Sequence, residues 1–480
     1  MTRLRAPFCS IVLAGLAVVA LVLLGANLAP RRGQVMAIAW EAPETGVSSS
    51  GNYTTYVPIA VRLHDRGYVV PFGTIMYGDV NDAEGLQVMR EAGSRWVTTF
   101  FVWSTVEPTE GTYDWSSFDA KALNASTAGM QVFALFTGNP TWAALSPDGP
   151  VSNTLALVKV TVAMAERYDC DGVDDAPGSP CVHYWSFYPE PDRESRWGHN
   201  GREFAAMLCQ VSPAIRAADP QAQVLIGGLA YDWFVEDGGP FVRSFLSDTL
   251  LRLNATCPGG ARAAIDAVAF HYYPISGERW PTIRDKALEI RSVMAQHGVG
   301  DLPLMCPEAG YWSSPKHGSS EPFQAQWLVQ MYVRGLSVGI QYMAWYKVYD
   351  DAVAGSEADA FPDRTCGLLR LDGSRKPSYY AYQTMTRELE VARYLRPFTY
   401  PTVEGYVFKT PTGREKTVLW AQGAALNVPF PYRCLYLVDK LGTRQTIADG
   451  DPTNDLDGLV NGRVTLRVRT NDPAYVEPCY

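Results

Sequence analysis

The sequence predicts an α/β fold, a parallel (β/α)8 TIM barrel followed by a small all-β, sandwich-like domain. Eight apolar, strand-like runs alternate with helix-like segments between residues 67 and 395. The centres of these runs carry no charged side chain, which is typical of parallel strands buried on both faces. From residue 396 to residue 480 the pattern changes to short alternating runs separated by turn residues, which indicates a separate β domain.

The strand-like runs lie at residues 68–77, 95–103, 131–137, 182–188, 223–229, 265–273, 302–307 and 339–346. Helix-like segments separate them. The segment at residues 321–338 carries an apolar stripe with helical spacing, made of Ala325, Leu328, Val329, Tyr332 and Leu336. Asn81 and Glu84 predict a capping box at the start of the first helix. A final helix is expected at residues 378–392.

A doubly wound open sheet is the competing α/β arrangement. It would bind its ligand at a reversal of strand order, usually with a glycine-rich phosphate turn. The sequence contains neither GxGxxG nor GxxxxGK. The closed barrel is therefore favoured.

The N-terminal segment has the pattern of an export signal. Arg3 and Arg5 precede an apolar stretch at residues 8–29. Because about 20 apolar residues can span a bilayer, residues 1–35 are predicted to be a signal peptide or a signal anchor that attaches the protein to a membrane. Residues 36–66 are rich in Ser, Gly, Thr and Pro and are expected to form a flexible tether. The protein is therefore expected to be extracellular or at the cell surface.

Nine cysteines in an exported chain suggest disulfide bonds. Cys170 and Cys181 enclose a short polar loop and are the pair that we expect first. Other plausible pairs are Cys209 with Cys257 and Cys434 with Cys479. Cys306 lies in an apolar run and is expected to be a small buried side chain.

The composition and the motifs argue against several functions. The net charge is −9 and no basic run is longer than a short pair such as Arg31-Arg32, which argues against nucleic-acid binding. No HExxH or GxSxG motif occurs, and the acidic segment 449–458 lacks the spacing of an EF-hand loop. A thiol nucleophile made of Cys306 and His271 is disfavoured, because Cys306 should point away from the barrel mouth. We expect no metal and no cofactor.

Two glutamates stand at predicted strand ends, each beside proline. Glu190 lies between Pro189 and Pro191 after the fourth strand, and Glu308 follows Pro307 after the seventh. Because Pro191 disfavours a helical backbone at the preceding residue, Glu190 is expected to be extended. Strand ends meet at the C-terminal face of a barrel. The two carboxyl groups are therefore expected to face each other, about 5 Å apart in a retaining glycosidase or about 6.5–9.5 Å apart in an inverting one.

Aromatic residues and a histidine accompany these glutamates. His271 and Tyr273 are two residues apart at the end of the sixth strand and share a face. A Tyr273 hydroxyl bonded to Glu308 would hold the carboxylate and favour its ionised form. For His271 alone the sequence favours a core histidine over a functional one. Candidate platforms on which a sugar ring could stack are Trp103, Trp142 and Trp345.

These motifs resemble those of clan A glycoside hydrolases. The resemblance rests on WSTVEPTEGTYDW at residues 103–115, EP at 190–191, HYY at 271–273 and EAG at 308–310. It extends from about residue 70 to the C-terminus and is greatest to family 39-like and family 5-like barrels with a C-terminal β-sandwich. It implies a retaining hydrolase of β-linked oligo- or polysaccharides. The roles it implies are general acid/base for Glu190, nucleophile for Glu308, hydrogen-bond partner of Glu308 for Tyr273, and sugar contact for Trp345.

Three positions depart from the pattern of that clan. Pro189 replaces the asparagine that usually precedes the acid/base, Thr98 stands where an arginine is common near the nucleophile, and Pro307 replaces a small hydroxyl residue. Lys347 on the eighth strand is a candidate replacement for the missing cation. Two alternatives follow: a catalytically weak or inactive barrel that binds glycans at the cell surface, and a structural surface protein whose β domain carries the interaction.

Overall fold

The eight predicted strands close into one parallel barrel. The structure, a computed structural model, describes residues 70–274, 279–351 and 362–479. These residues belong to one compact unit. The predicted export segment 1–35, the predicted tether 36–66 and the start of the first strand-like run lie outside the described residues.

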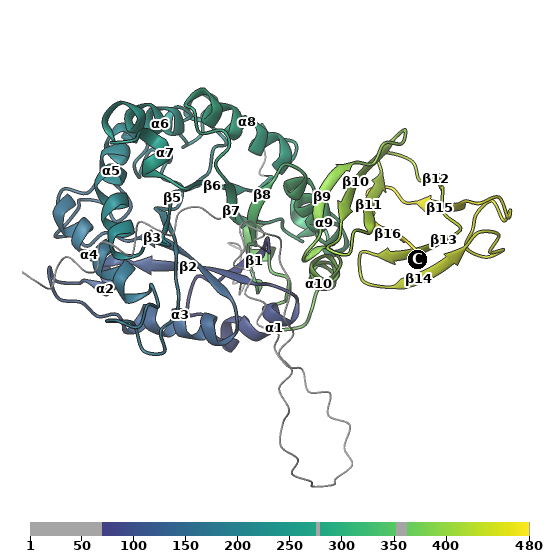
Figure 1. Cartoon of the computed structure of the whole chain (residues 1–480), viewed down its shortest axis with the longest axis horizontal. Coiled ribbons are helices and arrows are strands. Elements are labelled where there is room, and N and C mark those ends of the chain that lie inside the picture. Colours follow the sequence, from purple (N-terminus) through teal and green to yellow (C-terminus); the bar gives the residue numbers. More distant parts are fainter. Residues whose placement is uncertain (1–69, 275–278, 352–361, 480) are drawn as a thin grey trace, which may run out of the picture. The chain divides into compact units, whose positions relative to one another are not determined.

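Each barrel strand pairs in parallel with the next, and β1 closes the ring against β8 (Figure 1). Every predicted run overlaps one strand, which confirms the (β/α)8 barrel. The strands are β1 (Phe72–Ile75), β2 (Trp96–Val102), β3 (Gln131–Thr137), β4 (Tyr184–Phe187), β5 (Gln223–Leu229), β6 (Ala267–Tyr272), β7 (Leu304–Ala309) and β8 (Ile340–Trp345). Because β7 runs past its predicted end, Glu308 lies within the strand. Pro307 has no N–H to donate, and the pairing of β7 with β8 shifts register there.

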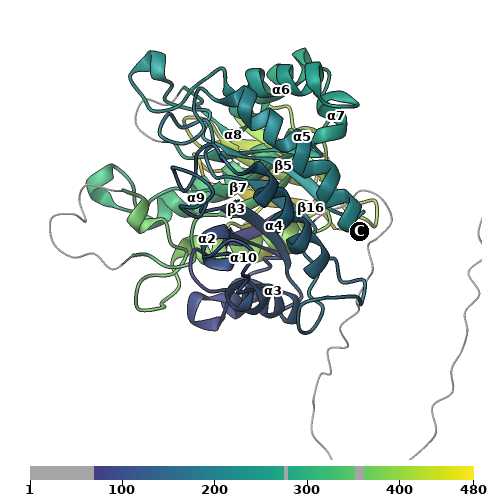
Figure 2. The same ribbon diagram turned by 90° about the vertical axis from the view of Figure 1, so that its left-hand side faces the viewer.

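Helices connect the strands and surround the barrel (Figures 1 and 2). They are α1 (Leu86–Glu91), α2 (Trp103–Val106), α3 (Ser116–Thr127), α4 (Thr154–Arg167), α5 (Gly201–Ala218), α6 (Phe245–Thr256), α7 (Gly260–Ala264), α8 (Ile283–Gln296), α9 (Glu321–Ser337) and α10 (Pro377–Leu389). Short 3-10 helices are η1 (Asp82–Glu84), η2 (Val235–Asp237), η3 (Pro315–His317) and η5 (Pro362–Thr365).

Local capping explains where two of these helices begin. Ser320 caps α9, because its hydroxyl accepts a hydrogen bond from the Phe323 N–H at 3.3 Å. The predicted capping residue Asn81 caps η1 instead of α1, and its Oδ1 accepts from the Glu84 N–H at 3.0 Å. Gly85, with a φ of 92°, separates η1 from α1.

The barrel interior is filled by side chains from several strands. They are Trp96, Phe133, Leu135, Leu225, Ala267, Ala269, Met305, Tyr342 and Ala344. Thr98 is buried among these strands, where its hydroxyl lies 2.6 Å from Tyr342 Oη and donates to the Pro307 carbonyl at 3.2 Å. The interior is therefore packed, and a site must lie at the rim, as in other barrels of this kind.

After the barrel the chain forms two antiparallel sheets, as the sequence predicted. Their strands are β9 (Arg393–Pro397), β10 (Val403–Lys409), β11 (Glu415–Ala421), β12 (Leu426–Phe430), β13 (Cys434–Asp439), β14 (Arg444–Ala448), β15 (Val464–Val468) and β16 (Ala474–Pro478). β12 and β15 pair with each other, and the other strands form a sheet in the order β14-β13-β16-β11-β10-β9. Both sheets contribute to one apolar core, which includes Leu419, Val428 and Leu466. Arg334 of α9 binds both oxygens of Glu404 on β10, at 2.7 and 2.8 Å.

Disulfides join the cysteines of all three expected pairs. They are Cys170–Cys181, Cys209–Cys257 and Cys434–Cys479. Cys306 is buried and forms no disulfide. Several disulfides are typical of an oxidising, extracellular compartment. Among the described residues no helix has the length and apolar character needed to cross a membrane; the apolar segment 8–29 is not among them.

Candidate active site

The two predicted carboxylates meet around His271 at the C-terminal ends of the barrel strands. Glu190 follows β4, and Glu308 pairs in register with His271 between β7 and β6. His271 Nδ1 lies 3.5 Å from Glu190 Oε1 and 4.0 Å from Glu308 Oε1. Because both distances share one atom, these two carboxylate oxygens are at most 7.5 Å apart, the sum of the two.

The backbone of Glu190 is not extended, so that expectation is wrong. Its φ is 45°, and the φ of Tyr188 is 61°. A following proline disfavours the right-handed helical region, and Glu190 avoids that region through a left-handed conformation. Such a conformation costs about 1–3 kcal/mol in a residue other than glycine, and it is concentrated at functional sites. The Glu190 N–H is bonded to the Gly228 carbonyl at 2.8 Å, which helps to hold this turn.

Two consecutive glycines in β5 make room for this arrangement. A Cβ at Gly227 would lie 1.7 Å from the Tyr188 carbonyl oxygen, and a Cβ at Gly228 would lie 2.0 Å from His271 Nε2. Any side chain at either position would therefore displace the chain next to Glu190 or the His271 ring.

Two tyrosine hydroxyls hold Glu308. Tyr273 donates to Oε1 at 2.6 Å, as the sequence predicted, and Tyr77 donates to Oε2 at 3.1 Å. Burial, followed by the negative charge of Glu308, raises the pKa of Tyr273 well above its ordinary value, so Tyr273 remains a donor. Sequence reasoning missed Tyr77, although it ends the first predicted strand and so reaches the same rim.

Positive charges surround Glu190. Arg193 and Arg196 each place an Nη1 atom 3.6 Å from Glu190 Oε2. Burial opposes ionisation of Glu190, but the hydrogen bond and charge of His271, together with Arg196 and Arg193, outweigh burial and hold the pKa of Glu190 below its ordinary value. The sequence analysis did not identify the two arginines, which follow Glu190 in the loop PDRESR.

His271 is buried between the two acids. Burial would lower the pKa of His271, but the negative charges of Glu308 and Glu190 outweigh it and raise the pKa. Its Nε2 atom has no hydrogen-bond partner among the described residues, because it faces Gly228. The ring is therefore directed, through Nδ1, toward the two carboxylates.

Two of the three predicted tryptophan platforms have no exposed ring face. Trp103 is fully buried and donates to Glu107 Oε2 at 2.7 Å. Trp345 is fully buried, donates to the Cys366 carbonyl at 2.8 Å and packs against Trp327. A sugar therefore has no surface to stack on at either ring. Trp142 is partly buried, and its N–H donates to the Glu107 carbonyl at 3.3 Å.

Tyrosines line the rim where Trp345 was expected. Tyr346, the next residue, lies with its ring centroid 5.5 Å from that of Tyr77 and 5.6 Å from that of Tyr273. Tyr77 is 49% exposed. Both Tyr77 and Tyr346 border a hollow of about 490 Å³ that reaches Lys347 and Asp351. Lys347 pairs with Asp351, so its charge is not placed on Glu308 as suggested.

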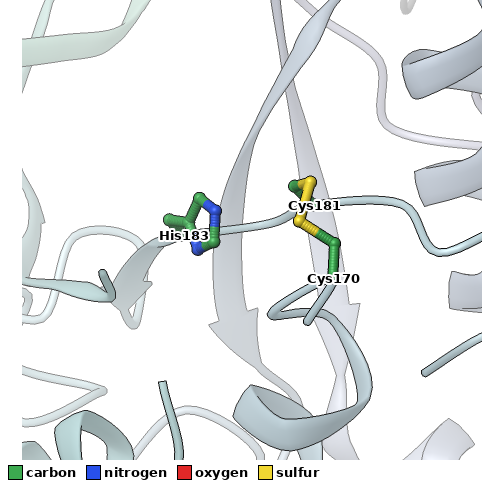
Figure 3. Close-up of side chains that lie close together, drawn as sticks. All are labelled: Cys170, Cys181 and His183. Atoms are coloured by element: carbon green, nitrogen blue, oxygen red, sulfur yellow. A yellow bond between two sulfur atoms is a disulfide. The ribbon is translucent and has the colours of Figure 1, made fainter. Parts of the chain in front are cut away.

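Two groups of potential metal ligands lie in the loop before β4. Cys170, Cys181 and His183 come close together, but Figure 3 shows the two sulfur atoms joined in a disulfide. His183 Nδ1 contacts Asp219 at 2.8 Å. The other group is Asp169, Asp171 and Asp175. Neither group lies at the carboxylate pair.

Sequence comparisons match only part of the chain. The profile of glycoside hydrolase family 42, a beta-galactosidase family, matches residues 80–146. No curated protein matches the chain.

Solved structures share the fold over most of the chain. A family 39 glycoside hydrolase from the gut symbiont Bacteroides cellulosilyticus WH2 is 16% identical, with a TM-score of 0.63 over 85% of this chain and 81% of that one. A family 39 beta-xylosidase from Caulobacter crescentus is 18% identical (TM-score 0.56; 86% and 98% covered). A family 30 subfamily 8 xylanase from Clostridium acetobutylicum is 12% identical (TM-score 0.56; 86% and 97% covered). The chain therefore has the fold of clan A glycoside hydrolases, a (β/α)8 barrel with a C-terminal β domain.

Proposed function

We propose that this chain, whose fold is that of clan A glycoside hydrolases, hydrolyses β-linked sugars of oligo- or polysaccharides with retention. The observation that carries the proposal is the meeting of Glu190 and Glu308 at one histidine nitrogen, with Glu308 held by two tyrosine hydroxyls. The upper limit of 7.5 Å accommodates the separation of about 5–5.5 Å that retaining enzymes use.

Each acid has a distinct role in this mechanism. Glu308, held by Tyr77 and Tyr273, attacks the anomeric carbon while Glu190 gives its proton to the leaving oxygen. Glu190 then takes a proton from water, which displaces Glu308 from the sugar. His271, between the two acids, orients both carboxylates and offsets the negative charge that they share.

The N-terminal segment extends this proposal to location. Residues 1–35 would export the protein, either as a cleaved signal or as a membrane anchor, and residues 36–66 would tether the catalytic barrel at 67–395 and the β domain at 396–480. The disulfides of the described residues support an extracellular location.

A catalytically weak barrel that binds glycans is the second candidate. Pro189 cannot supply the amide that would contact the sugar 2-hydroxyl. In addition, the lowered pKa of Glu190 opposes the protonated form that the first step requires. These two observations make a test of turnover essential.

The test compares the full-length protein with single variants on aryl β-glycosides and on plant and microbial polysaccharides. Glu190→Gln and Glu308→Gln should each lose several orders of magnitude in kcat, whereas the nearby exposed Glu194→Gln should keep its activity. Proton NMR should show the β-anomer as the first product. If the wild-type protein retains polysaccharide but releases no product, the glycan-binding alternative is correct.

A further inference from the structure

Among the residues that the structure describes, Arg193 and Arg196, in the loop between β4 and α5, have no close ion pair. Each lies 3.6 Å from Glu190 Oε2, beyond the 2.7–2.9 Å that is typical of a charge-assisted hydrogen bond. Other arginines of the chain bind both oxygens of a carboxylate at 2.6–2.8 Å, namely Arg167, Arg334 and Arg370. The Arg193 side chain is 42% exposed and the Arg196 side chain 25%. Both therefore retain donors for a further anion.

Neighbouring groups hold the two guanidinium groups in place. Arg196 Nη1 donates to the Pro189 carbonyl. The Arg193 guanidinium lies over the Phe241 ring, 5.6 Å from its centroid. The two groups are thus directed to the same oxygen of Glu190 by a backbone carbonyl and an aromatic ring.

The arginines lie on the leaving-group side of Glu190. Glu190 Oε1 faces His271 Nδ1, the atom that also faces Glu308, whereas Glu190 Oε2 faces the arginines. In the proposed reaction Glu308 bonds to the anomeric carbon, and Glu190 contacts the oxygen that leaves. Groups beside Glu190 Oε2 are therefore placed to meet the sugar that departs.

A second loop at this side presents an aromatic surface. The loop between β5 and α6 is bridged to the first loop, since the Glu194 N–H donates to the Pro240 carbonyl at 2.8 Å. It carries Trp233, which is 53% exposed and has a φ of 30°. Gly239 permits this conformation, because a Cβ there would lie 1.7 Å from the Trp233 carbonyl oxygen. An exposed tryptophan held in an unfavourable backbone conformation is a suitable face for a sugar ring.

We infer that the leaving-group side of the site binds a sugar that carries an anionic group, a carboxylate or a sulfate, on Arg193 and Arg196. The inference rests on the proposed function and specifies its substrate class. Guanidinium groups bind such anions through paired N–H donors, and Trp233 stacks on the ring of the same sugar.

This assignment reduces the conflict at Glu190. Without substrate, His271 and, after it, the two arginines favour ionised Glu190, which cannot act as an acid. An anion that pairs with the arginines offsets their positive charge, so Glu190 takes a proton from solvent. That proton then passes to the leaving oxygen. Substrates with a neutral leaving sugar do not offset the charge and are hydrolysed more slowly.

Binding is tested in the full-length Glu308→Gln variant, which prevents turnover. Calorimetry compares oligosaccharides that differ only in the terminal sugar at the reducing end, which is neutral, uronic or sulfated. An anionic sugar should bind about tenfold or more tightly than its neutral counterpart, in a salt-dependent way. Adding Arg193→Gln or Arg196→Gln to the Glu308→Gln variant should abolish this preference for the anionic sugar. The matched control adds Arg252→Gln, at an exposed arginine of α6, and should keep the preference. Comparison of the uronic with the sulfated oligosaccharide shows whether the site prefers a carboxylate or a sulfate.

The outcomes separate this inference from the proposed function. Equal affinity for neutral and anionic sugars, no binding of either, or a preference that survives both arginine variants overturns the inference. If the wild-type protein shows no turnover but keeps an arginine-dependent preference, the hydrolase proposal fails and the anion site stands. If the wild-type protein is active, the ratio of kcat/KM for substrates with an acidic leaving sugar to kcat/KM for those with a neutral one can be measured. This ratio should be about tenfold lower in Arg196→Gln than in the wild type.

Discussion

The Tyr77 hydroxyl donates a hydrogen bond to Glu308 Oε2 across 231 residues of sequence. Tyr273 donates to the other oxygen. Glu308 is thereby held by one hydroxyl that follows β1 and another that follows β6. Two donors to one carboxylate fix its orientation, as a positioned nucleophile requires.

Removing either hydroxyl should lower activity without unfolding the protein. A hydrogen bond to a charged group contributes about 1.5–3 kcal/mol, so Tyr273→Phe should reduce kcat/KM about 10–100-fold. Tyr77→Phe should have the smaller effect, because its bond is longer, 3.1 Å against 2.6 Å. Steady-state kinetics measure both, with thermal unfolding as the control. A larger loss in Tyr77→Phe would contradict the assignment.

Replacing His271 should shift the pH profile toward higher pH. The groups that face Glu190 are His271, Arg193 and Arg196, which lower its pKa, and the carboxyl group of Asp192, whose own pKa is raised by burial and by the like charge of Glu190. His271→Asn removes a hydrogen bond and a charge that lower the pKa of Glu190, so this pKa rises. Since the general acid must be protonated, kcat/KM declines as pH rises through that pKa. The alkaline limb of the variant should therefore move to higher pH, and a move to lower pH would refute the role.

The same pair should make stability depend on pH. Because the pKa of Glu190 is lower in the folded than in the unfolded protein, Glu190 contributes stability at pH values above its unfolded-state pKa. This stability is lost as pH falls through its folded-state pKa. Because the pKa of His271 is higher in the folded than in the unfolded protein, His271 contributes stability at pH values below its unfolded-state pKa. This stability is lost as pH rises through its folded-state pKa. The difference in Tm between wild type and His271→Asn should therefore be largest between about pH 4.3 and 6.5. A difference that does not change from pH 4 to pH 8 would argue against the pair.

A methyl group at Gly228 should displace His271. The added Cβ would lie 2.0 Å from Nε2, so Gly228→Ala should cost about 1–3 kcal/mol of stability and reduce activity. The matched control is Gly78→Ala, whose Cβ would meet only ordinary contacts at 3.5 Å and beyond. Denaturant unfolding and kinetics measure the two effects. Full activity in Gly228→Ala would show that the position of His271 is not required.

The disulfides should differ in their contribution to stability. Cys170–Cys181 closes 11 residues and Cys209–Cys257 closes 48. Because a longer loop loses more entropy in the unfolded chain, removing the second bond by paired alanine substitutions should cost about 1 kcal/mol more than removing the first. Chemical denaturation under non-reducing conditions tests this order. Equal costs would indicate that loop entropy does not determine their contribution.

Two errors in the predicted site lie where neighbouring strands decide the geometry. Trp345 was expected under the sugar, but the pairing of β7 with β8 shifts register before Ala309, Trp345 packs against Trp327, and Tyr346 lies at the rim instead. Side chains alternate along a strand, so one irregularity reverses which residue faces the mouth. The extended backbone expected for Glu190 was wrong because β5 and its glycines shape that turn.

The sequence by itself determined the barrel and the β domain after it, and it predicted that Glu190, Glu308 and Tyr273 lie together at strand ends. These follow from apolar periodicity and from residue types at the ends of runs, which are local properties. Only the tertiary structure placed Tyr77 on Glu308 and Arg193 and Arg196 beside Glu190. Such contacts depend on how the ring closes and how its loops fold back, and no local pattern encodes the distance between side chains on different strands.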